Sequence, residues 1–395
     1  MPGDRPQLSA AGSRFYDPKF RRLVYQSLLL IVIVLFFAAL INNVVDNLAR
    51  NRITSGFAFL RSIAGFDISQ TLIPYSLETS TYARAFWVGL LNTLLVSVLG
   101  IIFATMLGFF IGIARLSNNW LVAKVAGSYV EIIRNIPLLL QLLFWYNSLI
   151  SFLPDFRQSL SVPGGGYLNS RGLFLARPAF DSSILPFVAT IVFALVAAFA
   201  LRFYSRKKAE RTGTGMPMLP LAIAGLFLIP VLVLFVTTIN VEWTYPTLNR
   251  FNIGGGIEIL PEFVALLFGL VIYTAAFIAE AVRAGLLSVS RGQVEAAAAL
   301  GLRRRPSLKL VIIPQAKRVI IPPLTNQYLN LTKNSTLAVA IGYPDFVQIF
   351  TGTVLTQTGQ AVEVVAITLS VYLFLSLVIS LVMNIYQSRV TVVQR

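Results

Sequence analysis

Two long hydrophobic segments are separated by the polar stretch Ser290-Arg291-Gly292-Gln293-Val294-Glu295-Ala296-Ala297-Ala298-Ala299-Leu300-Gly301. Ser290 and Gln293 have the spacing of a capping box, in which side chains satisfy the free N–H groups at a helix start. The alanines favour a helix, and Gly301 is placed to end it in a left-handed conformation. A helix this short is marginal by itself in water. The stretch therefore predicts a short helix that docks against another surface.

The composition is that of a membrane protein. Of the 395 residues, 56% are hydrophobic and 12% are charged, a balance unlike that of a soluble domain. The chain has no cysteine and no histidine, which excludes disulfide scaffolds, thiol or imidazole catalysis and the usual zinc and haem ligands. We therefore expect no metal and no cofactor. The net charge of +16 raises the question of nucleic acid binding, which the distribution of that charge answers.

Eight apolar stretches are long enough to cross ~30 Å of hydrocarbon. If the N-terminus is cytoplasmic, 22 Lys and Arg residues lie on the inner side, including Arg318 at the inner end of a span, and 8 lie on the outer side. By the positive-inside rule both termini are then cytoplasmic, and the basic charge indicates topology rather than a nucleic acid partner. The first stretch has no cleavage signal, so we interpret it as an uncleaved helix. The predicted spans are 23–41, 86–114, 125–152, 185–201, 219–239, 261–282, 318–340 and 364–386.

Three stretches on the outer side are expected to be irregular. Residues 42–85 form a long polar link, whereas 154–184 and 240–260 each contain a run of three glycines, which is typical of turns. No internal repeat and no soluble domain is predicted. The chain also lacks the G-x-x-x-x-G-K-[ST] pattern of a P-loop, so if ATP drives the protein, another subunit must hydrolyse it.

Glu295-Ala296-Ala297, followed by Gly301 and then by Pro314, resembles the EAA loop of ABC importer permeases, which contacts the ATPase subunit. Further matches resemble the polar amino acid uptake branch of that family and cover about 86–152 and 257–386. Asn135 and Ile136 depart from its usual Gly-Thr, and Asn334 from its usual Asp. The matching segments include Gly89–Leu94, Glu131–Gln141, Ala279-Glu280, Arg283–Gly285, Gly292–Ala297, Pro314–Ala316, Pro322–Leu324, Lys333–Leu337 and Ile341-Gly342.

The resemblance implies an all-α polytopic protein of the bacterial inner membrane with the type I ABC importer permease fold. An extra first helix and an inserted pair of spans make the plan most like the permeases of general L-amino acid importers. Their partners would be two copies of an ATP-binding subunit, a second related permease and a periplasmic amino-acid-binding protein. The expected regions are 1–85 with the extra helix, 86–152 as the first core part, 153–256 as the insertion and 257–395 as the second core part.

Polar residues within the span 318–340 are candidates for the substrate path. A charge near the centre of a spanning helix costs about 2.5–3.5 kcal/mol on insertion scales, so it usually faces a cavity or a partner. Lys333 shares a helix face with Asn326 and Asn330 by spacing, and Asn334 follows it. We expect this set to line the path. The alternatives are that Lys333 snorkels or pairs with an acid. Pro322-Pro323 would break the helix below it.

Two charged couples are candidates for a cytoplasmic gate. Glu131 and Arg134 are three residues apart, as are Glu280 and Arg283, and opposed couples at similar depth would cross-link two helices. The alternative is that they anchor the helices at the membrane interface. Gly108-x-x-x-Gly112 is a small-residue pattern that indicates close helix packing.

Three function classes remain to be compared. The leading hypothesis is transport, in which the chain supplies half of a pore driven by a separate ATPase. A membrane-bound enzyme would usually need clustered acids, His or Cys around a catalytic centre. An ion-driven secondary transporter would be expected to contain inverted repeats, and none is evident.

Overall fold

The structure of this protein is a computed structural model that describes residues 18–50, 56–180, 241–249 and 253–390, with four single positions between 190 and 197. The chain forms two compact units. One comprises Met1–Leu95 with Pro344–Arg389, and the other Val96–Tyr343 with Val390–Arg395. The predicted spans 185–201 and 219–239 lie outside the described residues, apart from those four positions.

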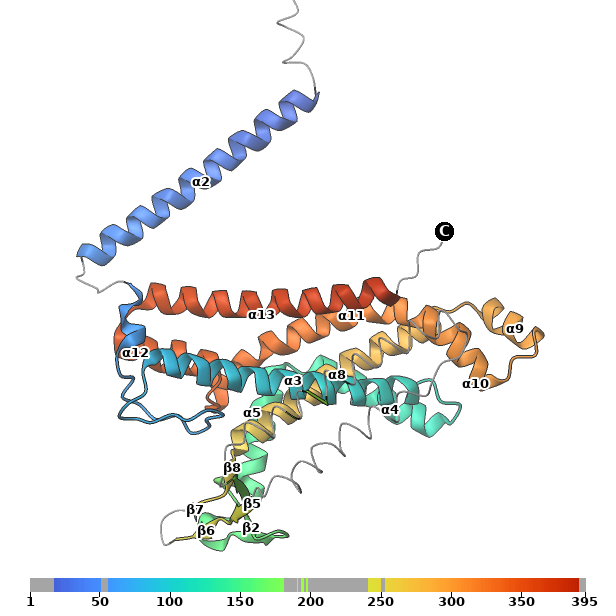
Figure 1. Cartoon of the computed structure of the whole chain (residues 1–395). Helices are drawn as coiled ribbons and strands as arrows, with labels where there is room; N and C mark the ends of the chain where they lie inside the picture. Colours follow the sequence, from blue (N-terminus) through green and yellow to red (C-terminus); the bar gives the residue numbers. More distant parts are fainter. Residues whose placement is uncertain are drawn as a thin grey trace, which may run out of the picture. The chain divides into compact units, whose positions relative to one another are not determined.

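The first unit contains helices, whose course Figure 1 shows, and its buried core includes aromatic side chains. Phe346 and Phe350 stack with ring centroids 4.7 Å apart, and both are fully buried. Residues 56–81, expected to be part of an irregular link, contribute Phe59 and Ile68 to this core. Residues 62–81 contain no helix or strand element, as expected, although their buried side chains join this core. The expectation was wrong for residues 42–50, which belong to the helix that ends at Arg50. The helices are α2 (Pro18–Arg50), η1 (Phe57–Arg61), part of α3 (Tyr82–Ala114), η5 (Gln348–Val354), α12 (Leu355–Thr358) and α13 (Ala361–Val390).

The second unit is organised around α8 (Pro261–Leu287), which packs against α4, α5 and α11. α8 is apolar on nearly every side, as expected for a helix surrounded by others. The remaining helices are the rest of α3, α4 (Trp120–Asn135), α5 (Leu138–Phe152), α9 (Arg291–Ala299), α10 (Arg304–Ser307), the π-helical η3 (Leu308–Ile312), α11 (Ile313–Asn334) and the 3-10 helix η4 (Ser335–Ile341).

Four described helices are long and apolar enough to cross a membrane: α2, α3, α8 and α13. α5 is a shorter apolar helix. α11 coincides with most of the predicted span 318–340 but is much more polar than these four. Within the described residues, the expected number of eight spans is therefore only partly represented.

Prolines at two sites act differently from the prediction. The expected single span 125–152 consists of α4 and α5, which are separated at Ile136-Pro137, because proline lacks an N–H and restricts the residue before it. The side-chain nitrogen of Gln141 donates to the carbonyls of Ile133 and Ile136, both at 2.9 Å, and so satisfies the end of α4. Pro322-Pro323, in contrast, lies inside a continuous α11. Both prolines are exposed, and burial of the opposite face holds the helix together.

The expectation of irregular segments at 154–184 and 240–260 was wrong over most of their described length. These residues form the strand region, defined here as 154–180 and 241–259, with a small buried core of Phe156, Phe174 and Ile253. A four-stranded antiparallel sheet has the order β1-β2-β3-β8. Its strands are β1 (Leu160–Val162), β2 (Gly166–Asn169), β3 (Gly172–Leu175) and β8 (Ile257–Ile259). The strand region also contains two separate two-stranded sheets, β4 (Arg177–Phe180) with β5 (Val241–Thr244) and β6 (Thr247–Leu248) with β7 (Ile253–Gly254).

Glycines in the strand region allow backbone segments to approach closely. A Cβ atom at Gly166 would lie 2.4 Å from the carbonyl oxygen of Phe174. At Gly256, where φ is +73°, a Cβ atom would lie 2.5 Å from the carbonyl oxygen of Leu175. The two glycine runs therefore serve strand packing as well as turning.

Candidate functional site: the coupling loop and the polar face of α11

The coupling loop, residues 290–314, begins with α9. Every residue of α9 is exposed except Ala297, which retains 3% of its accessible surface. Ser290 is the N-cap, but its side chain makes no capping bond. The predicted capping box is therefore not formed. The carbonyl oxygen of Gln293's side chain instead accepts a hydrogen bond from Gln315 at 3.4 Å, so this side chain contacts α11 rather than its own helix start.

The end of α9 agrees with the prediction for Gly301. This residue has φ +73°, and the N–H groups of Gly301 and Leu302 donate to the carbonyls of Ala298 (2.9 Å) and Ala297 (3.1 Å). This pair of bonds is a Schellman motif, which closes a helix with a left-handed residue. Glycine takes that conformation at little cost, whereas a β-branched residue would be strained.

The second half of the loop leads into α11 without a break in helical structure. α10, the π-helical turn η3 and α11 follow one another directly. Pro314 lies in the first turn of α11, where its missing N–H is tolerated. Glu295, Ala296 and Pro314 are exposed, so three of the five predicted coupling residues present their side chains on the surface of this unit.

α11 has one polar, exposed face and one buried face. Asn326, Asn330 and Lys333 are all exposed, as their spacing predicts, and Asn334 is half-buried. Within the described part of the chain, no carboxylate lies within ion-pair distance of Lys333. The alternative in which Lys333 pairs with an acid is therefore not seen among these residues. The opposite face consists of Ala316, Ile320, Ile321, Leu324, Leu331 and Thr332.

The two charged couples do not face one another as expected. Glu280 binds Arg283 at 2.7 Å and also binds Arg115 at the end of α3, a residue that was not predicted. Arg134 lies over the ring of Phe277 on α8, 5.0 Å from its centroid. Among the described residues no ion pair joins the couple on α4 to the couple on α8. The reason is that Glu280 already has two guanidinium partners on α3 and α8.

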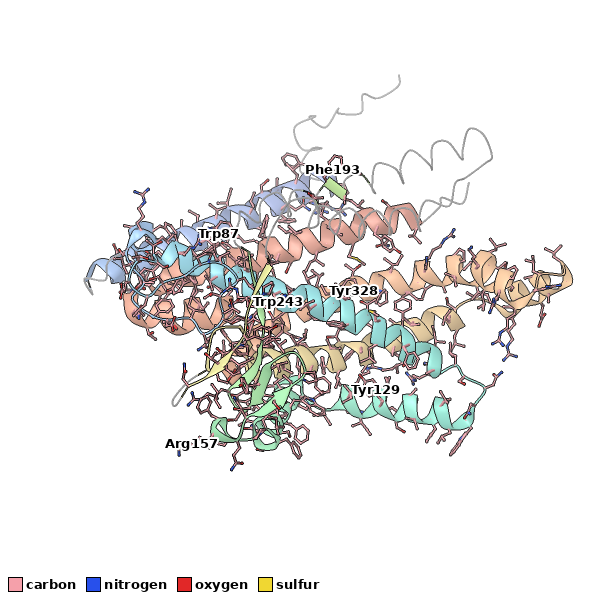
Figure 2. All side chains as sticks on the ribbon, turned by 60° about the horizontal axis from the view of Figure 1, so that its bottom comes forward. Trp87, Tyr129, Arg157, Phe193, Trp243 and Tyr328 are labelled. Atoms are coloured by element: carbon pink, nitrogen blue, oxygen red, sulfur yellow. The ribbon has the colours of Figure 1, made fainter. Side chains whose placement is uncertain are left out.

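The small-residue pattern in α3 packs against α8. A Cβ atom would lie 2.6 Å from Ile278 Cβ if built at Gly108, and 2.8 Å from the carbonyl oxygen of Ala279 if built at Gly112. Tyr129 of α4, labelled in Figure 2, donates its hydroxyl to the Ile272 carbonyl of α8 at 2.6 Å. These contacts support the packing interpretation of the pattern.

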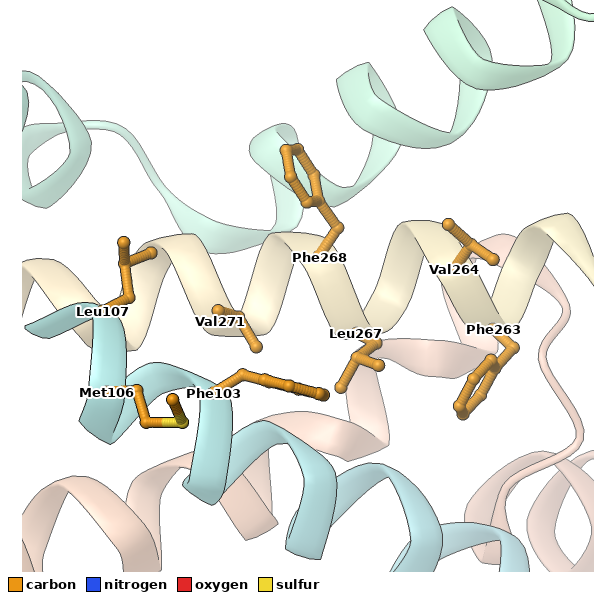
Figure 3. A pocket seen from close by; sticks show the side chains of 8 residues that line it. All are labelled: Phe103, Met106, Leu107, Phe263, Val264, Leu267, Phe268 and Val271. Carbon is orange, nitrogen blue, oxygen red and sulfur yellow. The ribbon is translucent and has the colours of Figure 1, made fainter.

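A cavity of about 520 Å³ lies between α3 and α8. Figure 3 shows that side chains from both helices line it, and all of them are apolar. Such a lining offers no partner to a charged solute, because burying an unpaired charge is costly. We therefore do not place a substrate path there. Its lining residues are Phe103, Met106, Leu107, Phe263, Val264, Leu267, Phe268 and Val271.

Residues 100–392 match the family model described as "Binding-protein-dependent transport system inner membrane component". The chain belongs to this family. It is 48% identical to the "Putative amino-acid ABC transporter permease protein YhdX" of Escherichia coli (strain K12) over 96% of this chain and 97% of that protein. It is also 48% identical to the "General L-amino acid transport system permease protein AapQ" of Rhizobium johnstonii, over 97% of this chain and 95% of that protein. The family and the apolar helices establish a multi-pass inner membrane protein.

A third relative is the "Glutamate/glutamine/aspartate/asparagine transport system permease protein BztB" of Rhodobacter capsulatus. The two chains are 41% identical over 96% of each. The alignments with all three relatives run over nearly the whole length of this chain and of each relative.

Proposed function

We propose that this chain is the transmembrane permease subunit of an ATP-driven ABC importer for amino acids, built on the type I permease fold. The observation that carries the proposal is α9, a nine-residue helix that is exposed except at Ala297. A short, exposed alanine-rich helix is only marginally stable by itself in water, but its small side chains allow it to pack closely in a groove on another protein. The coupling loop would therefore contact a separate ATPase, with Glu295, Ala296, Ala297, Gly301 and Pro314 at the contact.

The polar face of α11 supports a role for the chain as half of a pore. Exposed amides and an ammonium would be costly against lipid, so this face needs a polar cavity or a partner. A second, related permease subunit would complete the pore. Two copies of the ATPase and a periplasmic amino-acid-binding protein would complete the complex, as in the family. The relatives named above supply the inference that the cargo is amino acids.

Asn326, Asn330, Lys333 and Asn334 are the proposed substrate path. An amino acid carries a carboxylate and an ammonium, and both must keep hydrogen-bond partners as they leave water. The ammonium of Lys333 suits the carboxylate, and the amide oxygens suit the ammonium. At the inner end of α4 and α8, Glu131, Arg134, Glu280 and Arg283 stay the candidate gate residues, now as separate contacts rather than as a cross-link.

Reconstitution into proteoliposomes tests the proposal. The chain, a related permease, the ATPase and the binding protein should together accumulate a labelled amino acid only when ATP is supplied on the ATPase side. Omitting the ATPase should abolish uptake. Uptake driven by an imposed ion gradient without the ATPase would favour an ion-driven secondary transporter, and full uptake without the second permease would exclude the heteromeric pore.

A further inference from the structure

Arg115 forms a charged link between α3 and α8. It follows the last residue of α3, its side chain is only 14% exposed, and its guanidinium binds one carboxylate oxygen of Glu280. The other carboxylate oxygen binds Arg283 at 2.7 Å. One carboxylate thus holds two guanidiniums, of which one comes from its own helix and one from a different helix.

This link lies close to the coupling helix along the chain. α8 ends at Leu287 and α9 begins at Arg291, so three residues separate them. A displacement that α9 receives therefore passes along the chain into the end of α8 on one side, and through α10 and η3 into α11 on the other. Glu280 lies in the last two turns of α8, which makes its bond to Arg115 the nearest described ion pair through which α3 would feel that displacement.

The contact beneath the link has a different character. Gly108 and Gly112 let α3 lie directly against α8 at Ile278 and Ala279, which gives close contact but no directional bond. A charge-assisted hydrogen bond has defined geometry and fixes the position of one group relative to another. The bond of Arg115 to Glu280 therefore fixes how far α3 can slide along α8.

We infer that Arg115 is a positioning residue whose bond to Glu280 makes α3 move together with α8 and the coupling helix. The inference rests on the proposed function, since it assigns a role within ATP-driven transport. The two guanidiniums make it testable. If Arg115 is removed, Glu280 keeps Arg283, so no uncompensated carboxylate is left in a partly buried site, which is the change that usually destabilises a protein.

The experiment uses the complete complex in proteoliposomes and measures the number of ATP molecules hydrolysed for each amino acid transported. Arg115→Gln should raise this ratio about 2- to 30-fold, the range over which residues along a coupling route alter coupling. Lys124→Gln is the matched control, because Lys124 is exposed on α4 and forms no described ion pair. Its ratio should equal that of the unchanged protein. Arg115→Lys keeps the charge but replaces the guanidinium nitrogen that binds Glu280 with an ammonium on a different side chain, and its ratio should lie between the two.

A purely structural role would lower uptake and ATP hydrolysis in the same proportion, with less assembled complex by size-exclusion chromatography, and would leave the ratio unchanged. That result overturns the inference. If Arg115→Gln does not assemble, Arg115→Lys decides, and an unchanged ratio in that variant overturns the inference. If the complex without any substitution does not transport with ATP, the proposed function and the inference fail together. This outcome is distinct from failure of the inference alone, in which the unsubstituted complex transports normally.

Discussion

The coupling loop and the strand region belong to the same unit but are held in different ways. In the coupling loop, the bonds that end α9 join residues three to five positions apart, such as Gly301 to Ala298. In the strand region, β3 pairs with β8, so Leu173 lies opposite Ile259 across most of the insertion. The first region depends on local contacts and the second on contacts between distant parts of the chain. Substitutions should therefore affect them differently.

The largest effect is expected in the coupling loop. Gly301→Val should reduce uptake by more than about tenfold, because the Schellman end of α9 requires a left-handed residue and valine is strained there. The variant should be assayed for uptake and for co-purification with the ATPase. Gly292→Ala is the control, since Gly292 has no positive φ and a Cβ atom there meets no neighbour within 4 Å. Normal uptake with normal ATPase association in Gly301→Val would show that the loop does not need this geometry.

The second effect tests the polar face of α11. Lys333→Met should lower uptake about tenfold, the lower end of what the loss of one charge-assisted contact worth roughly 1.5–3 kcal/mol implies, while the complex still assembles. Lys317→Met, an exposed position on the same helix, is the control. Unchanged uptake would identify Lys333 as a snorkelling anchor. Loss of the protein from the membrane would identify a structural role.

The comparison explains what the sequence could predict. The end of α9, the shared face of Asn326, Asn330 and Lys333, and the packing glycines of α3 follow from spacing along one helix, and all are found in the structure. The strands were missed because they are two to four residues long and have little alternating pattern. Only pairing across the insertion makes them strands.

The functional site also combines features with a local signal in the sequence and features that depend on distant residues. The break between α4 and α5 had a local signal in Pro137, which the long apolar run concealed. Arg115 had no signal beyond being basic and following an apolar span, because its partner Glu280 lies 165 positions away. Nothing in the two couples themselves indicates that Arg115, a residue outside both, binds Glu280. The role of the couples as a gate stays a prediction.

A third prediction addresses the strand region directly. Gly166→Val should open the sheet, because its Cβ atom would collide with the Phe174 carbonyl, and overpacking typically costs about 1–3 kcal/mol. Trypsin should then cut faster after Arg171, which is followed by Gly172. Ser161→Val, at an exposed position of the neighbouring strand, should leave the cleavage rate unchanged. Equal cleavage rates in both variants would mean that the sheet does not protect the peptide bond after Arg171.

A fourth prediction sets a local contact against a non-local one within a single residue. Asp345 accepts a hydrogen bond from the N–H of Gln348 at 2.8 Å, a local bond that favours the charged form. Burial among distant residues opposes it and is the larger cause, so the pKa of Asp345 is raised to about 7. The folded protein then holds a proton that the unfolded chain releases near its ordinary pKa of 3.8.

The sign of the pH dependence follows from that difference. The contribution of protonated Asp345 to stability is fully present below about pH 4 and is lost as the pH rises through about 7, at roughly 1.4 kcal/mol for each unit of pKa difference. Asp345→Asn keeps a side chain that can accept the Gln348 bond but does not titrate. The melting temperature of the unchanged protein, measured relative to that of Asp345→Asn, should therefore fall by several degrees between pH 4 and pH 8. A relative melting temperature that stays constant or rises over this range would mean that the local bond outweighs burial at this carboxylate.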